Sequence, residues 1–385
     1  MFRNTVNCAY FLALLLLNCL YMIECTQGDQ QQEAPRPVMG YVTESEATCQ
    51  SDCTRYPQRC VSEENIKNIA AKLISNKLHD AGYQMIIIDA CWYSMKTYDT
   101  VDTMTYVMPN FPSLNIMKAW KLDLVKISGC FTDDLKRIHG FSRMRNLMDE
   151  LDMKIQIACD VSEKHVLKKI DWNDADPDDL LKGCDSWRLH STNGNSFSPG
   201  EMGVWRDRAN ALKSNGGKGF WFDLGPIKII TETNQLKQIT MKLVMRSMLA
   251  SPMMITGDLD QLDQKEIDLL SNRRCIRINQ DIGGMMPVVI HSDNAVTFWS
   301  RRLTGRHDEY ALILLNNNDV ENTQNFNMFD VYVDNIRENR NFYNLNGVFN
   351  EFVKKKIRVW DSMILTVPPG GVSMYLVKKR KNDVK

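Results

Sequence analysis

Polar side chains that could act as acids, bases or sugar ligands stand directly after four apolar stretches of the chain. They are Asp89, Ser128, Asp160 and Asp223. The stretch before Asp89 contains three successive isoleucines, and β-branched side chains favour strands. A strand that is apolar at every position is buried on both faces, as in a parallel sheet. The strands of an α/β barrel bring their carboxyl ends to one mouth, where catalysis takes place, so we expect these four side chains to meet there.

The composition limits the classes of function. The chain has 385 residues, enough for two domains, and its 44% hydrophobic content is ordinary for a globular protein. Lysine plus arginine and aspartate plus glutamate both number 47, so the formal net charge is zero. A chain without a basic surplus is not expected to bind nucleic acid or a membrane surface.

The first 36 residues predict an export signal followed by a linker. Residues 1–25 contain Arg3 and a compact apolar core at 10–17, as in a signal peptide. The core is too short for a membrane anchor. Residues 26–36 are polar and are expected to be a linker. We therefore expect the secretory pathway, with a secreted or lysosomal protein that carries no Asn-x-Ser/Thr site for N-glycosylation.

Eight cysteines lie beyond the signal, and in an oxidising compartment they are candidates for disulfides. They are Cys49, Cys53, Cys60, Cys91, Cys130, Cys159, Cys184 and Cys275. The first three could also be interpreted as metal ligands, but no histidine lies near them in the sequence. No metal and no organic cofactor is therefore expected.

Helical and strand patterns alternate as far as residue 284. Ser62 is a suitable N-cap, and apolar residues then recur at helical spacing before the strand at 85–88. With an expected strand at 38–41, this makes a βαβ unit. Further expected strands are 122–127, 154–160, 184–188, 216–223 and 253–256, and further expected helices are 133–152, 234–249 and 263–270. Beyond residue 284 only short strand patterns follow, which predict an antiparallel β-sandwich.

The chain also carries a set of short motifs. They are P-x-M-G-Y at 37–41, C-x3-C-x6-C at 49–60, D-A-G-Y at 80–83, I-D-A-C-W at 88–92, V-K-I-S-G-C at 125–130, W-R at 187–188 and I-N-Q-D at 278–281. In this order the set resembles the α-galactosidase / α-N-acetylgalactosaminidase family, glycoside hydrolase family 27. The resemblance implies an α/β fold, a (β/α)8 TIM-type barrel at 37–284, followed by a C-terminal antiparallel β-sandwich at 285–385.

The activity that the resemblance implies is retaining hydrolysis of terminal α-D-galactose or α-N-acetylgalactosamine. One carboxylate attacks the anomeric carbon, and a second carboxyl group protonates the leaving oxygen and then activates water. The family nucleophile, in K-x-D-G-C, falls at Ser128, and the acid/base group, four residues after the arginine of W-R, falls at Thr192. Because both carboxylates are replaced, we expect weak or no hydrolysis. The alternative, a new nucleophile pair, would need a base, and no histidine is aligned there.

The sugar-binding positions of the family are kept in part. The resemblance implies substrate-binding roles for Asp89, Lys126, Asp160, Arg188 and Asp223. Asp89 could instead be a structural residue that hydrogen-bonds to neighbouring strand ends. The departures that argue against tight binding are Glu44, Ala90 and Gly225, which stand where the family has a tryptophan and two aspartates.

One unit of the family barrel has no counterpart between residues 112 and 120. The family has a helix, its third strand and another helix there. Seven strands cannot close an eight-stranded barrel without readjustment, because strand number and shear are linked. The barrel is therefore either gapped at this place, or the gene model lacks an exon.

Two further hypotheses remain beside a weakly active galactoside-binding protein. The family forms dimers, so the chain could be a non-catalytic binding or partner protein that forms a homodimer or pairs with an active family member. The resemblance implies the disulfides Cys49–Cys91, Cys53–Cys60 and Cys159–Cys184, which leaves Cys130 and Cys275 free or paired between chains. Alternatively, Asp160 and Asp223 could be a relocated catalytic pair, and a carboxyl separation of about 5–5.5 Å would favour retention and ~6.5–9.5 Å inversion.

Overall fold

The structure is a computed structural model that belongs, from Arg36 to Lys385, to one unit. It describes residues 36–43, 55, 62–88, 118–119, 121–128, 134–160, 183–188, 219–229, 235–293, 295–304, 309–331, 342–349 and 353–379. Among these residues, no helix is both long enough and apolar enough to cross a bilayer.

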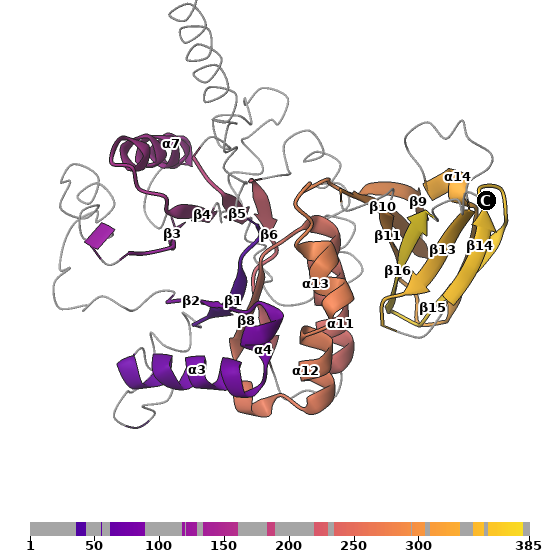
Figure 1. Ribbon diagram of the computed structural model, residues 1–385, viewed down its shortest axis with the longest axis horizontal. Coiled ribbons are helices and arrows are strands. Elements are labelled where there is room, and N and C mark those ends of the chain that lie inside the picture. The colour runs from indigo at the N-terminus through magenta and orange to yellow at the C-terminus, as the bar shows by residue number, and fades with distance from the viewer. Residues whose placement is uncertain are drawn as a thin grey trace, which may run out of the picture. The chain divides into compact units, whose positions relative to one another are not determined.

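Two four-stranded parallel sheets make up the N-terminal part of this unit (Figure 1). The first has the order β2-β1-β8-β7, with β1 at Met39–Val42, β2 at Met85–Ile87, β7 at Ile227–Ile229 and β8 at Met253–Gly257. The second has the order β3-β4-β5-β6, with β3 at Leu124–Ser128, β4 at Gln156–Asp160, β5 at Ser186–Arg188 and β6 at Trp221–Asp223. Gly40 lets β1 approach β2, since a Cβ there would lie 1.9 Å from the Met85 carbonyl oxygen.

The two sheets continue into each other through residues 221–229. Only three residues separate β6 from β7, so one broken strand pairs with β5 by its first half and with β8 by its second half. The combined order of the described strands is β2-β1-β8-β7/β6-β5-β4-β3. This is the strand order of a (β/α)8 barrel, as expected from the sequence, with β2 and β3 at the two ends of the described order. The place between residues 112 and 120 where one barrel unit is predicted to be missing lies outside the described residues, except for 118 and 119.

Helices connect and cover the parallel strands. Their bounds are α3 Glu63–Ser75, α4 Leu78–Ala81, α7 Asp134–Glu150, α11 Gln235–Leu249, the short 3-10 helix η3 Leu259–Gln261, α12 Gln264–Leu270 and α13 Arg273–Asn279. The predicted N-cap is confirmed, because the Ser62 hydroxyl accepts a hydrogen bond from the Asn65 N–H. The single helix predicted after it is two helices, because Lys77 has a left-handed backbone (φ 58°) that ends the first.

An antiparallel part follows from residue 288. Its elements are β9 Val288–Ser292, β10 Val296–Leu303, β11 Glu309–Asn316, β12 Asn322–Phe326, the short helix α14 Met328–Val331, β13 Phe342–Gly347, β14 Val353–Arg358, β15 Met363–Val367 and β16 Val372–Lys379. Six strands form one sheet in the order β14-β13-β16-β11-β10-β9, and β12 pairs with β15 (Figure 1). The predicted antiparallel β domain is therefore present.

The six-stranded sheet is covered on both faces. Every residue of β11 is buried, which an alternating pattern with one solvent face would not produce. Leu312 and Leu314 share a core with Leu365 of β15, whereas Ile313 shares a core with Leu243 of α11. The barrel helices therefore cover one face of the sheet and the β12–β15 pair covers the other.

Candidate site at the carboxyl ends of the parallel strands

Four of the residues singled out in the sequence lie in one row across the second parallel sheet. Ser128 of β3 is in register with Asp160 of β4, Asp160 with Arg188 of β5, and Arg188 with Asp223 of β6. Each is the last residue of its strand. Because neighbouring strands are about 4.8 Å apart, the row is roughly 14 Å long. Lys126 lies two residues before Ser128, one step deeper on the same face of β3.

The Arg188 guanidinium lies directly over the backbone of Gly225, just after β6. A Cβ placed on Gly225 would be 2.7 Å from Nη2 and 2.9 Å from Cζ of Arg188. Gly225 also has φ +74°, a conformation that favours glycine. The space that a side chain at position 225 would need is therefore occupied by Arg188.

Asp223 is held by the same turn. Its Oδ1 accepts a hydrogen bond from the Gly225 N–H at 2.7 Å. The next backbone N–H, of Leu224, donates to the Ser251 hydroxyl at 3.0 Å. An aspartate that bonds to the N–H two residues ahead stabilises a tight turn, so the carboxylate is fixed beside Arg188.

A second guanidinium, that of Arg246, lies below this turn. The side chain comes from α11 and is fully buried. It donates to the carbonyl oxygens of Lys242 (2.9 Å), Leu224 (3.4 Å) and Gly225. Burial lowers the pKa of Arg246 to about 10; the Asp223 carboxylate opposes this shift and the Arg188 charge adds to it.

Sequence analysis predicted the helix at 234–249 but gave Arg246 no role. A signal was available, because a charged residue among apolar residues of a helix that packs in a core needs buried polar partners. Its neighbours Leu243, Val244, Met245 and Met248 are buried.

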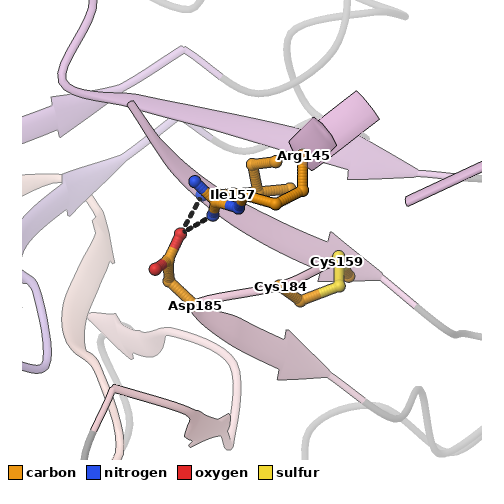
Figure 2. The surroundings of a disulfide bond; sticks show 5 residues. All are labelled: Arg145, Ile157, Cys159, Cys184 and Asp185. Atoms are coloured by element: carbon orange, nitrogen blue, oxygen red, sulfur yellow. Dashed lines mark hydrogen bonds and ion pairs between the residues drawn. A yellow bond between two sulfur atoms is a disulfide. The ribbon is translucent and has the colours of Figure 1, made fainter. Parts of the chain in front are cut away.

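The implied disulfide between Cys159 and Cys184 is present, with 5.9 Å between the Cα atoms (Figure 2). It joins β4, one residue before Asp160, to the segment that enters β5. Next to it, the Asp185 carboxylate accepts hydrogen bonds from the Ile157 N–H at 2.7 Å and from Arg145 of α7 (Figure 2). Asp185 precedes β5, so these bonds tie the amino end of that strand to α7.

Several predicted residues lie outside the described residues. They are Asp89, Thr192, Glu44, Ala90, Cys49, Cys53, Cys60, Cys91 and Cys130. Of the strand-end row, Ser128 and Asp160 are described by their backbone only. Within the described ranges, no group of histidine, cysteine, aspartate and glutamate side chains could hold a metal ion.

Cys275 is a free, buried thiol on α13. Its Sγ lies 2.8 Å from the Ser247 hydroxyl of α11, and burial raises its pKa to about 12. A buried protonated thiol reacts poorly. Because the thiol is buried, a bond between chains through Cys275 would require α13 to move.

The family model and the curated relatives that match this chain belong to the same family. A family model described as "Alpha galactosidase A" (Melibiase_2) matches residues 36–115 and 113–281. The human alpha-N-acetylgalactosaminidase is 21% identical over 304 residues, which cover 68% of this chain and 72% of the relative. The human alpha-galactosidase A is 21% identical over 329 residues, 74% of this chain and 75% of the relative.

Solved structures show the same fold. Alpha-galactosidase I from Mortierella vinacea matches with a TM-score of 0.67 at 17% identity, over 89% of this chain and 97% of that one. The Saccharomyces cerevisiae alpha-galactosidase solved with raffinose matches with a TM-score of 0.62 at 15% identity, over 90% and 98% of the two chains. At these identities the similarity establishes the fold alone.

Proposed function

The chain belongs to the alpha galactosidase A (Melibiase_2) family, and from this premise we propose that it is a sugar-binding family member with weak or no glycosidase activity. The proposed ligand is a terminal α-galactoside or α-N-acetylgalactosaminide. The proposed binding residues are Lys126, Arg188 and Asp223, together with Asp160 and Asp89.

The observation that carries this proposal is the position of Ser128. It ends β3 in register with Asp160, at the strand end where the family pattern has its nucleophile. A retaining glycosidase needs a carboxylate there, because the hydroxyl of serine is a weak nucleophile without an adjacent base. Loss of the acid/base group alone costs roughly 10²–10⁴ in rate. Replacement of both groups, at Ser128 and Thr192, supports a loss of practical turnover.

The register argues against a retaining pair made from Asp160 and Asp223. They stand two strands apart with Arg188 between them. Their Cα atoms are therefore roughly 9–10 Å apart, which is wide for the ~5–5.5 Å carboxyl separation of retaining enzymes. An inverting pair would fit this spacing better, so the assay below includes both aspartates.

The test is release of the aryl alcohol from an aryl α-galactoside and an aryl α-N-acetylgalactosaminide by the purified protein. We expect no release above buffer, and the same result for Ser128→Ala. Asp160→Asn and Asp223→Asn are the informative comparisons. Clear release by the unaltered protein that is lost in either aspartate variant but kept in Ser128→Ala would show a relocated catalytic pair and refute the proposal.

We further propose that the protein works in the secretory pathway as a homodimer or paired with an active family member. The Cys159–Cys184 disulfide supports an oxidising compartment. Light scattering of the purified protein, alone and mixed with an active family α-galactosidase, tests the assembly. A monomer in both samples would contradict it.

A further inference from the structure

The strand-end site contains more positive than negative charge among its described side chains. The charge of Arg188 acts against that of the buried Arg246, and the Asp223 carboxylate favours it. Among these three described side chains, there are two guanidinium groups and one carboxylate. Lys126 in the adjoining strand adds a further positive charge, whereas the carboxylates of Asp160 and Asp89, which are also proposed for this site, lie outside the described side chains.

The two guanidinium groups differ in what they can still bind. Arg246 is buried and donates to three backbone carbonyl oxygens. Arg188 is partly exposed, and among the described residues its guanidinium makes no hydrogen bond and no ion pair. An arginine whose planar fork is not used by the protein is suited to a carboxylate or sulfate, which it can bind through two parallel hydrogen bonds.

The backbone of Arg188 is held in register between β4 and β6, and its guanidinium lies over Gly225, which has no side chain to displace it. The strand therefore carries this guanidinium to the carboxyl ends of the parallel strands.

We propose that this site binds an anionic sugar, in which the carboxylate of a uronic acid or the sulfate of a sugar sulfate ester pairs with the Arg188 guanidinium. The inference rests on the proposed sugar-binding function and specifies the class of ligand. A neutral galactose unit offers no charged partner to the Arg188 guanidinium, whereas the carboxylate or sulfate of an anionic unit does.

The experiment is isothermal titration calorimetry of the whole protein with D-galacturonate, D-galactose 6-sulfate, D-galactose and inorganic sulfate, at one pH and low ionic strength. We expect at least one anionic sugar to bind about tenfold or more tightly than galactose. The arm that binds best identifies the anion as carboxylate or sulfate. Binding of the anionic sugar should weaken as the salt concentration is raised, because exposed charges are screened. The salt series uses the unaltered protein and needs no variant.

Arg188→Met should abolish the preference for the anionic sugar, and Arg188→Lys should keep part of it, since lysine retains the charge without the fork. Arg143→Met is the matched control, because Arg143 is exposed on α7 and should leave binding unchanged.

Equal or tighter binding of galactose, a preference that survives Arg188→Met, or inorganic sulfate binding as tightly as the sulfated sugar would overturn the inference. Hydrolysis of the aryl glycosides would instead overturn the proposed function, so the two failures are distinguishable.

Discussion

Arg188 and Gly225 are coupled at the level of single residues. The guanidinium occupies the volume that a side chain at position 225 would need, and the glycine also supplies the positive φ that turns the chain from β6 toward β7. The resemblance assigns an aspartate to this position, and the Arg188 guanidinium here lies where the Cβ of that residue would need to be. Restoring an acid at position 225 should therefore disturb the arginine.

Gly225→Ala should lower the free energy of unfolding by more than the cost of the left-handed backbone conformation alone. A left-handed conformation costs a residue with a Cβ about 1–2 kcal/mol, and displacement of Arg188 adds to this. Urea unfolding measures the change. Gly370→Ala is the control, because Gly370 also has positive φ but its Cβ would lie 3.2 Å from Lys237 Nζ and 4.0 Å from the Asn318 carbonyl oxygen, with no contact under 3.0 Å. Equal losses of unfolding free energy in Gly225→Ala and Gly370→Ala would contradict this coupling. It would also be contradicted if the double variant Gly225→Ala/Arg188→Ala lost as much stability as Gly225→Ala alone.

Activity should return only when both replaced carboxylates are restored together. Retaining hydrolysis requires a nucleophile and an acid/base group in the same site. The double variant Ser128→Asp/Thr192→Asp should release aryl alcohol at a rate about 10² or more above either single variant. Initial rates with an aryl α-galactoside provide the measurement. Release by Ser128→Asp alone at the rate of the double variant would show that Thr192 does not mark the acid/base position.

At the level of elements, the position of the short strand β5 is set by the contacts that connect it to β4 and α7. It has three residues, and it carries Arg188 at its carboxyl end. The Cys159–Cys184 disulfide and the Asp185 carboxylate connect its entry to β4 and α7 (Figure 2). A strand of this length gains little stability from its own pairing, so these contacts set the position of the candidate site.

Asp185→Asn should weaken this junction. The carboxylate accepts from a backbone N–H and from Arg145, and hydrogen bonds to charged groups contribute about 1.5–3 kcal/mol each. We expect a loss of about 1–3 kcal/mol in the free energy of unfolding, measured in urea. Asp149→Asn, on the exposed face of α7, should change it little. A double-mutant cycle with Arg145→Met that shows no coupling would refute the assigned contact.

At the level of the whole molecule, the barrel helices and the antiparallel sheet form one core with buried charges at its edge. The buried Arg301 of β10 donates to the carbonyl oxygens of Ile278 (3.0 Å), Met285 (2.8 Å) and Ser247. Glu309 of β11 binds Arg277 of α13 at 2.6 Å and Lys378 of β16 at 2.8 Å. Separation of the two parts would therefore leave charges unpaired as well as apolar surface exposed.

Glu309 should make stability fall at acid pH. Burial alone would raise the pKa of its carboxyl group, but the hydrogen bonds and charges of Lys378 and Arg277 outweigh burial and lower it. Its contribution is then complete above the unfolded pKa of about 4.3 and is lost as the pH falls through the lower folded pKa.

Glu309→Gln should therefore lower stability at pH 7 by about 1–3 kcal/mol and reduce the further loss below about pH 5. Urea unfolding between pH 7 and pH 3.5 tests this. Glu321→Gln, at an exposed position, should keep the steeper acid slope of the unaltered protein. An unchanged slope in Glu309→Gln would show that other groups control acid stability.

Patterns within short stretches predicted much of the fold. Short strand patterns predicted β1 to β6 and β8, and the Ser62 cap and the apolar spacing after it predicted α3. The sequence patterns missed β7, β12, β13 and α13, whose three to seven residues are too short for a clear period. The N-cap of α13 is Asn272, whose side chain accepts from two backbone N–H groups, and apolar periodicity does not reveal such a cap.

The sequence by itself determined the family and the strand ends that carry Ser128, Asp160, Arg188 and Asp223, and the resemblance to the family implied the pairing of Cys159 with Cys184. These depend on residue types in local order, which motifs and periodicity record. Only the tertiary structure decided that Arg188 lies over Gly225, that Arg246 is buried beneath the same turn, and that Cys275 is enclosed. Such contacts join residues 20 or more positions apart, and their energies depend on burial and distance, which no local pattern contains.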